Sequence, residues 1–374
     1  MDPKHDRPRK RIDSLQGLRA CGFLAIFFSH SVEGYASFGA AGVSIFLILS
    51  GFLLTYGYLR RDTALRQPSP AGNLRFAVQK LKKLYPLHLF TMLLTLCLIL
   101  LRPGLFSAAN EEIPVKTVLN LALLQAWAPK SAYYFSLNSV SWYLSTAGFT
   151  YLIFPWLLVP LRRMSRPRSA VLALLAVLAL EIGLSLAFSR FGSKDTAQWF
   201  SLHWLTYIFP LFRLLDFTIG ALFGFLFLHR REQPAPGFGR RLLASCAECL
   251  LILALFLLCR LYPSIPQSLR YSAVFLLPSA LLIYLLACGT GYLSLILSRK
   301  PFQLIGALSA SAFLFHQLVI RALQPWIQTT FPMLKWYVSV LLLLIVTLLL
   351  SAVWDRLQQS IEKRRVKSSD GGKR

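Results

Sequence analysis

Acidic residues and long polar stretches are both scarce in this sequence. Its 374 residues include 15 Asp and Glu against 40 Lys and Arg, which gives a formal charge of +25 at pH 7. Only 15% of the residues are charged, whereas 56% are hydrophobic. Because little polar sequence is left for a soluble domain, we expect an all-α, polytopic integral membrane protein.

Cysteine pairs of the kind that build a secreted disulfide framework are also missing. The six cysteines lie within or at the ends of apolar runs, where we expect reduced, packed thiols. Cys246 and Cys249 have CxxC spacing, but no second pair accompanies them, so packing is the preferred interpretation. No A-x-A-like cleavage site follows the first apolar run, which argues against a signal peptide.

The excess of positive charge does not indicate nucleic acid. Most Lys and Arg residues lie in short loops between apolar segments, a pattern that the positive-inside rule explains. The pattern places both termini in the cytoplasm, and we therefore expect the cytoplasmic membrane and a lipid bilayer as surroundings, with no nucleic-acid partner.

Ten apolar segments are expected to cross the membrane. They are 14–33, 40–59, 84–101, 141–161, 169–188, 204–228, 242–261, 271–288, 302–323 and 334–354. The chain then divides into a basic cytoplasmic N-terminus (1–13), a membrane domain (14–355) and a basic cytoplasmic tail (356–374). A basic loop is expected over 60–83, and 103–140 should be mostly external, with an apolar part (118–127) too short to span.

The first apolar stretch carries two ionisable side chains that membrane helices normally avoid. Arg19 and His30 are eleven residues apart, about three helical turns, so both fall on one face roughly 16 Å apart. Ionisable groups inside a membrane helix normally face the protein interior or a wet cavity. A snorkelling arginine and a structural histidine are the alternative, and we favour a functional pair.

The two side chains suggest different chemistry. Arg19, near the cytoplasmic end, suits an anionic ligand. His30, near the outer end, can take and return a proton near neutral pH, as a general base on a hydroxyl does. Glu33, one turn further, is a candidate for orienting the imidazole or holding its charge.

Five segments in sequence resemble signatures of the membrane acyltransferase 3 family. They are LRACGFLAIFFSH (18–30), GVSIFLILSGFLL (42–54), KLKKLYP (80–86), FPLFRLLDFTIG (209–220) and LSASAFLFHQ (308–317). Two details differ: Lys80 and Lys83 stand in place of arginines, and Phe313 in place of a tyrosine. The similarity covers almost the whole chain.

The resemblance implies an O-acyltransferase that acts on carbohydrates or other cell-surface molecules. It implies acyl-CoA, above all acetyl-CoA, as the co-substrate, while no bound cofactor and no metal are expected. Arg75, Lys80 and Lys83 lie where the phosphates of acyl-CoA could rest, although a purely topogenic role explains these charges equally well. Because the sequence ends soon after the expected tenth helix, we expect no extracytoplasmic esterase-like domain of the kind that some relatives carry.

One further segment departs from the family pattern. SVSWYLSTAGFTYLIFP (139–155) resembles a W-x-L-S-x-E signature, in which Trp142 and Ser145 match on the acceptor side. Ala147, however, stands where many members have glutamate, so no carboxylate role is transferred. Glu33 and Glu181 are conceivable substitutes.

Two other sets of residues have alternative interpretations. Arg213 and Asp216 are three apart on one expected helix and should pair, more as a structural ion pair than as catalytic groups. His316 is expected at a depth comparable with His30. Acceptor binding and a hydrogen bond between helices are equally open for it.

The sequence thus favours direct acyl transfer from cytoplasmic acyl-CoA to a hydroxyl at the outer face, with His30 as the base. An acyl-enzyme is less favoured, because no serine or cysteine has a convincing base partner. The main alternative is a transporter or flippase of a glycan or lipid-linked sugar, although no internal repeat is visible. A sensor or scaffold without catalysis is a third hypothesis.

Overall fold

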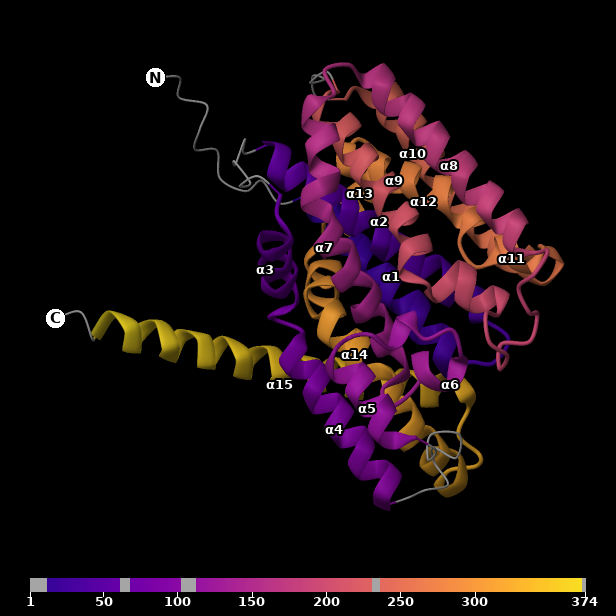
Figure 1. Cartoon of the computed structure of the whole chain (residues 1–374), viewed down its shortest axis with the longest axis vertical. Helices are drawn as coiled ribbons and strands as arrows, with labels where there is room; N and C mark the ends of the chain where they lie inside the picture. Colours follow the sequence, from indigo (N-terminus) through magenta and orange to yellow (C-terminus); the bar gives the residue numbers. More distant parts are fainter. Residues whose placement is uncertain (1–11, 61–67, 102–111, 231–235, 372–374) are drawn as a thin grey trace.

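The computed structural model describes residues 12–60, 68–101, 112–230 and 236–371, with side chains up to residue 364 (Figure 1). Over these residues the chain is helical, and the sole β-type contact is an isolated bridge between Ser193 and Ser201. The all-α prediction is confirmed. Most of the expected basic N-terminus (1–13) lies outside the described residues.

A long helix occupies each of the ten segments expected to cross the membrane. They are α1 (Asp13–Ser31), α2 (Ala36–Arg60), α4 (Tyr85–Leu101), α7 (Trp142–Arg163), α8 (Pro167–Phe188), α9 (Pro210–Leu228), α10 (Phe238–Leu261), α12 (Ala273–Cys288), α14 (Lys300–Thr330) and α15 (Trp336–Gly371). Shorter helices connect them: α3 (Pro70–Leu81), α5 (Ile113–Leu121), α6 (Ser131–Tyr134), α11 (Gln267–Arg270) and α13 (Tyr292–Leu297).

Eight helical segments of the described chain are long and apolar enough to cross a bilayer, or nine if α3 and α4 form one span bent by 65°. Of the ten expected segments, α4 qualifies only together with α3, and α1, which carries Gln16, Arg19 and His30, does not qualify. A polytopic membrane protein is therefore confirmed. The number ten and the cytoplasmic location of the termini stay predictions.

The expected loop over 60–83 was wrong in part, because it contains helix α3. Ser69 caps this helix by accepting a hydrogen bond from the Gly72 amide at 3.2 Å, and Pro70 takes the first helical position. Phe76 then stacks on Phe154 of α7, with ring centroids 5.7 Å apart. Proline and glycine indicate a loop here, but the cap and the packing on α7 stabilise a helix.

Helices α2 and α9 form the centre of the bundle and touch backbone to backbone. A Cβ on Gly51 of α2 would overlap the carbonyl oxygen of Phe217, and one on Gly220 of α9 would overlap that of Ile48. Only glycine allows this approach, because any side chain would push the helices apart. α1 lies against α14 in the same way, since a Cβ on Gly306 would overlap the carbonyl oxygen of Gln16.

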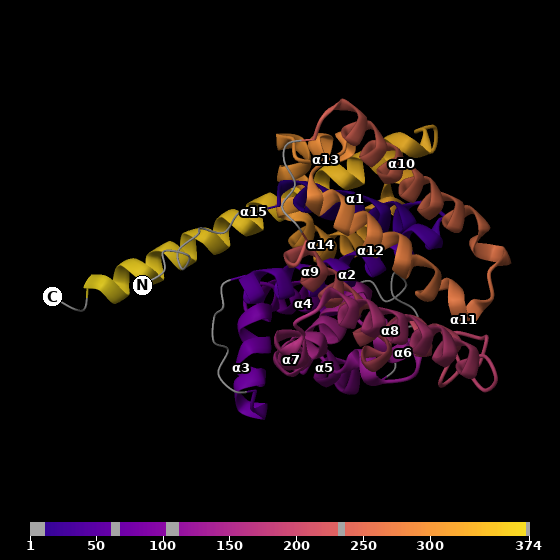
Figure 2. The same ribbon diagram turned by 90° about the horizontal axis from the view of Figure 1, so that it is seen from above.

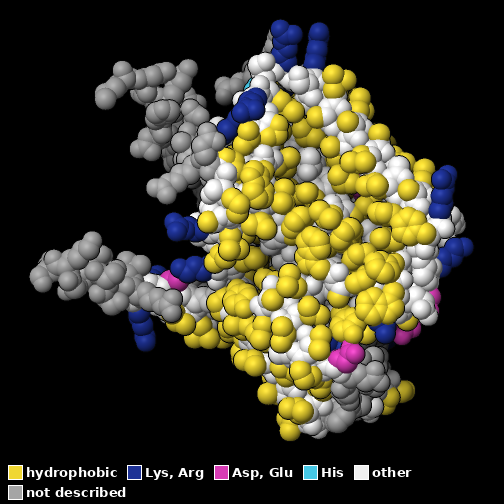
Figure 3. Space-filling model, in the orientation of Figure 1, with side chains coloured by type: hydrophobic (Ala, Val, Ile, Leu, Met, Phe, Trp, Pro, Cys, Tyr) yellow, Lys and Arg dark blue, Asp and Glu magenta, His cyan; other side chains and the backbone are white. Residues whose placement is uncertain are grey.

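Three helices form the apolar outside of the bundle. In the most apolar 18-residue part of each helix, only 17% of α8, 22% of α10 and 17% of α15 is buried inside the protein. Hydrophobic side chains cover the middle of the face in Figure 3, and Lys and Arg gather at its margins. A surface of this kind fits lipid in the middle and water at the edges.

α15 continues beyond the expected tenth span. It remains helical to Gly371 and projects from the bundle, on the side where α3 lies (Figures 1 and 2). The region 356–371 of the expected tail is thus helical. Gln358 on this projecting part donates a hydrogen bond to the carbonyl oxygen of Lys83 at 2.9 Å.

The connection between α4 and α7 is held by buried amides. Asn120 Nδ2 donates to Ser136 Oγ at 2.8 Å, and His88 Nε2 donates to the carbonyl oxygen of Asn120 at 2.9 Å. Asn138 Nδ2 donates to the carbonyl oxygen of Leu314 in α14 at 2.9 Å. The expected non-spanning stretch (118–127) falls in this connection. Through Asn138 the connection holds α14 at Leu314, two residues before His316.

Candidate active site

The structure brings together two histidines from opposite ends of the chain, here called the histidine pair. His30 ends α1, and His316 lies in the middle of α14. Their ring centroids are 5.0 Å apart, and His316 Nε2 lies 3.2 Å from His30 Nδ1. His316 is fully buried, whereas His30 is exposed. For His316, the structure shows the hydrogen bond between helices that the sequence left as one of two alternatives.

Hydrogen bonds to the backbone define the tautomer of both neutral rings. His30 Nδ1 lies 2.9 Å from the carbonyl oxygen of Ile26, and His316 Nδ1 lies 2.7 Å from that of Phe313. A carbonyl oxygen only accepts, so both Nδ1 atoms carry the hydrogen. His316 Nε2 is then an acceptor for His30 Nδ1–H. The lone pair of His30 Nε2 is left for another partner, on an exposed ring.

Residues of α14 beyond His316 complete the surroundings of His30. Arg321 is close enough for its charge to act on His30, and Gln324 Nε2 donates to the carbonyl oxygen of Ser31 at 3.3 Å. Sequence reasoning missed Arg321, although a charged residue in an apolar helix five residues after His316 was a visible signal. Glu33 lies exposed in the turn after α1 and makes no described hydrogen bond to His30.

Arg19 lines a separate cavity of about 230 Å³, here called the Arg19 cavity. Arg19 Nε is buried and has no hydrogen-bond partner among the described residues. Lys80 of α3 lines the same cavity, with its ammonium 5.0 Å from the ring centroids of Tyr58 and Phe76. A buried donor without a partner and a second cation beside it suit an anionic or strongly accepting ligand.

The other two expected acyl-CoA residues do not reach this cavity. Arg75 and Lys83 are exposed, on α3 and in the turn that follows it, and neither lines the cavity. Of the three cations expected to bind acyl-CoA, the structure therefore places Lys80 alone beside Arg19. Ser50, Tyr143 and Tyr151 also line the cavity, and sequence reasoning did not single them out.

Trp142 and Ser145 lie on α7 but not in the Arg19 cavity. Trp142 is buried against Tyr207, with ring centroids 5.1 Å apart. Ser145 lines a different cavity, an apolar one of about 790 Å³ between α3, α5 and α7. Its hydroxyl is buried and has no hydrogen-bond partner within the described ranges. Ala147, on the same helix, is also buried.

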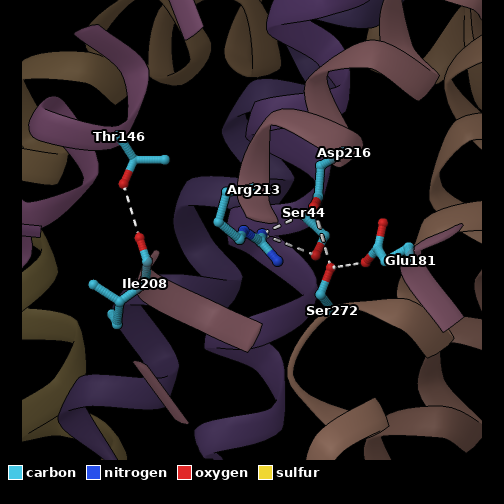
Figure 4. Close-up of polar contacts among 7 residues, drawn as sticks. All are labelled: Ser44, Thr146, Glu181, Ile208, Arg213, Asp216 and Ser272. Atoms are coloured by element: carbon cyan, nitrogen blue, oxygen red, sulfur yellow. Dashed lines mark hydrogen bonds and ion pairs between the residues drawn. The ribbon is translucent and has the colours of Figure 1, made fainter. Parts of the chain in front are cut away.

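Arg213 and Asp216 pair as their spacing predicts, at 3.0 Å, and both are fully buried (Figure 4). Ser272 extends the pair, with its hydroxyl 2.7 Å from Glu181 Oε1 and 3.2 Å from Asp216 Oδ1. Arg213 also donates to Ser44 Oγ at 3.3 Å. None of these side chains lines the Arg19 cavity, and the cluster joins α2, α8 and α9 to the start of α12. This placement favours the structural interpretation.

Comparison with known proteins gives the family. The acyltransferase domain family matches residues 12–354. Acyltransferase MdmB of Streptomyces mycarofaciens is 29% identical, over 83% of this chain and 79% of its own. The peptidoglycan O-acetyltransferase OatA of Listeria monocytogenes is 24% identical, over 87% of this chain and 52% of its own.

The O-acetyltransferase OatA of Staphylococcus aureus is 21% identical, over 96% of this chain and 58% of its own. This chain thus spans little more than half the length of the two OatA proteins. No solved structure matches it. The chain belongs to the acyltransferase family, as an all-α, multi-pass membrane O-acyltransferase.

Proposed function

We propose that this protein transfers an acetyl group from cytoplasmic acetyl-CoA to a hydroxyl of a cell-surface or exported carbohydrate. The acetyl group and the carbohydrate acceptor are suggested by the names of the OatA relatives. The observation that carries the proposal is the histidine pair, which leaves His30 Nε2 unprotonated on an exposed ring. This is the atom that a general base needs.

His30 Nε2 removes the proton of the acceptor hydroxyl as its oxygen attacks the thioester carbonyl. The imidazolium that forms donates from Nδ1 to His316 Nε2 and to the carbonyl oxygen of Ile26. The proton then passes from Nε2 to the departing thiolate, so the acetyl ester and CoA are formed without an acyl-enzyme. Arg321 supplies positive charge beside the ring, where negative charge develops on the carbonyl oxygen.

Arg19 and Lys80 hold the donor from the other end of α1. The Arg19 cavity, with its unsatisfied Nε donor, takes the arm of acyl-CoA, and the acyl end of that arm extends along α1 to the acceptor hydroxyl at His30. The phosphates rest outside the cavity, on the exposed side chains of Arg75 and Lys83. Both ends of the reaction then lie along one helix, in the cytoplasmic membrane.

The direct test follows radiolabelled acetate from acetyl-CoA into extracted cell-surface glycan, in membranes that contain equal amounts of each variant. We expect alkali-labile label in the glycan with the unmodified protein and its loss with His30→Ala. His229→Ala is the matched control: His229 is exposed and has the same Nδ1 contact to the carbonyl four residues earlier (3.0 Å), but no histidine of the described chain is its partner.

His229→Ala should keep the activity of the unmodified protein. Equal label with His30→Ala would remove His30 from the chemistry. Movement of glycan across the membrane without any acylation would instead support the transporter alternative.

A further inference from the structure

The buried cluster drawn in Figure 4 contains two carboxyl groups but a single cation. Glu181 of α8 and Asp216 of α9 are both fully buried, and Ser272 lies between them. The cation is Arg213, which binds Asp216 at 3.0 Å, whereas Glu181 forms no ion pair with another described residue. If both carboxyl groups were ionised, the cluster would hold one unbalanced negative charge inside the protein.

The two carboxyl groups differ in how well their oxygens are bound. Arg213 binds Oδ2 of Asp216, and Ser272 Oγ lies 3.2 and 3.3 Å from its two oxygens. Glu181 has one contact, at Oε1, and its buried Oε2 has no partner in the part of the chain that the structure describes. A buried carboxylate needs a counter-charge and hydrogen bonds, and without them the neutral acid is favoured. Asp216 therefore suits the ionised form and Glu181 the protonated one.

The hydrogen bonds of Ser272 lead to the same assignment. A serine hydroxyl carries a single hydrogen. When that hydrogen points to Asp216, the contact of 2.7 Å between Ser272 Oγ and Glu181 Oε1 needs a hydrogen from Glu181. The distance is the usual one for an O–H donor and an oxygen acceptor. Glu181 then donates to Ser272, Ser272 donates to Asp216, and Glu181 Oε2 is left as a neutral carbonyl oxygen.

We propose that Glu181 holds a proton in the folded protein and acts as a hydrogen-bond donor. The proton links α8, through Ser272 just before α12, to the Arg213–Asp216 pair of α9, and it leaves the cluster without net charge. A protonated carboxyl group is not a base. Glu181 therefore does not supply the carboxylate that sequence reasoning sought in place of Ala147. This role is independent of the acyl donor and of the acceptor.

Infrared spectroscopy of the purified protein in detergent tests the assignment, because protonated carboxyl groups absorb apart from carboxylates. We expect a carboxylic-acid C=O band that shifts when the protein contains glutamate with heavy carbon in its side-chain carboxyl group. The band should lose intensity in Glu181→Gln. Glu362→Gln, on the exposed part of α15, is the matched control and should keep the full intensity.

Amide substitutions separate the two carboxyl groups by their effect on stability. Glu181→Gln keeps the shape and the hydrogen-bond donor of a protonated acid, so the Tm in detergent should stay within about 2 °C of that of the unmodified protein. Asp216→Asn leaves the charge of Arg213 without its counter-charge, and the Tm should fall by roughly 5 °C or more.

The outcomes distinguish the possible proton positions. A glutamate band that weakens in Glu181→Gln, together with the smaller change in Tm for this variant, supports the proposal. If the labelled, unmodified protein shows no glutamate band, or if Glu181→Gln keeps its full intensity, Glu181 is ionised and the proposal is overturned. A larger fall in Tm for Glu181→Gln than for Asp216→Asn would also overturn it and would place the proton on Asp216. The labelled, unmodified protein gives its result even if a variant does not fold.

Discussion

At the scale of single residues, the two nitrogens of His30 have different surroundings. Nδ1 is bound to the carbonyl oxygen of Ile26 and to His316, and Nε2 has its lone pair free. A base works best when its ring orientation and tautomer are fixed before the substrate arrives. His316 provides this, because it is buried and is itself fixed by the carbonyl oxygen of Phe313.

His316 is therefore expected to act as a positioning residue. His316→Ala should lower kcat by about 10- to 100-fold, the loss that follows a small misplacement of a reacting group. The KM for acetyl-CoA should stay unchanged, because His316 does not line the Arg19 cavity. His316→Gln, which can still donate and accept a hydrogen bond, should recover part of kcat. An equal fall in protein abundance and rate, with no recovery in the glutamine variant, would reduce His316 to a packing role.

Arg19, unlike His316, should affect the binding of acetyl-CoA and therefore its KM. Arg19→Gln should raise the KM for acetyl-CoA about tenfold or more, because a hydrogen bond to a charged group contributes about 1.5–3 kcal/mol. Initial rates at varied acetyl-CoA concentrations measure the effect. Arg190→Gln, in the exposed segment after α8, is the control and should leave KM unchanged. A fall in kcat alone for Arg19→Gln would contradict the donor-binding role.

At the scale of helices, the contact between α2 and α9 supports the whole site. It holds Arg213 against Ser44, and α2 also supplies Phe46 and Ser50 to the Arg19 cavity. The two helices approach until a Cβ on Gly220 would overlap the carbonyl oxygen of Ile48. No flexible side-chain end is there to move aside, so added volume must shift a helix.

Gly220→Ala should accordingly destabilise the protein by roughly 1–3 kcal/mol, the usual cost of overpacking a buried contact. Thermal unfolding in detergent measures it as a lowered Tm. Gly183→Ala is the control, because a Cβ there meets nothing within 4 Å on the lipid-facing helix α8. Equal Tm values for the two variants would show that the α2–α9 contact does not need glycine.

The sequence predicts the elements better than their partners. Apolar runs are local signals, and each of the ten led to a helix. The Arg213–Asp216 pair was predictable too, because three residues along a helix bring side chains together. α3 was missed, because serine and proline occur both at the start of helices and in turns. Only the packing on α7 shows that Ser69 and Pro70 begin a helix here.

Contacts between distant segments had no such local signal. His30 and His316 are 286 residues apart, and the sequence around either histidine does not indicate that the two are in contact. Glu33 was a candidate partner because it is close in sequence, but the turn after α1 leaves it exposed. Glu248, a buried carboxylate in the apolar helix α10, also has its partners far along the chain: it accepts hydrogen bonds from Ser294 Oγ and from the amide of Leu293 in the first turn of α13.

At the scale of the whole molecule, the proposed donor and acceptor sites lie towards opposite ends of α1. Arg19 and Lys80 share a cavity near its start, and His30 is exposed at its end, about 16 Å further along the axis. In the proposed orientation, acetyl-CoA enters from the cytoplasm and the acceptor from outside. The acetyl group stays on the arm of CoA, which extends along α1, until the acceptor hydroxyl attacks it beside His30.

The most direct test of this account uses sealed inside-out membrane vesicles with extracted glycan in the lumen. Radiolabelled acetyl-CoA is supplied to the outer medium, which faces the cytoplasmic side of the protein. We expect alkali-labile label in the enclosed glycan, and none when the vesicles carry His30→Ala. Label that appears only when acetyl-CoA and glycan share one side of the membrane would contradict transfer between opposite ends of α1.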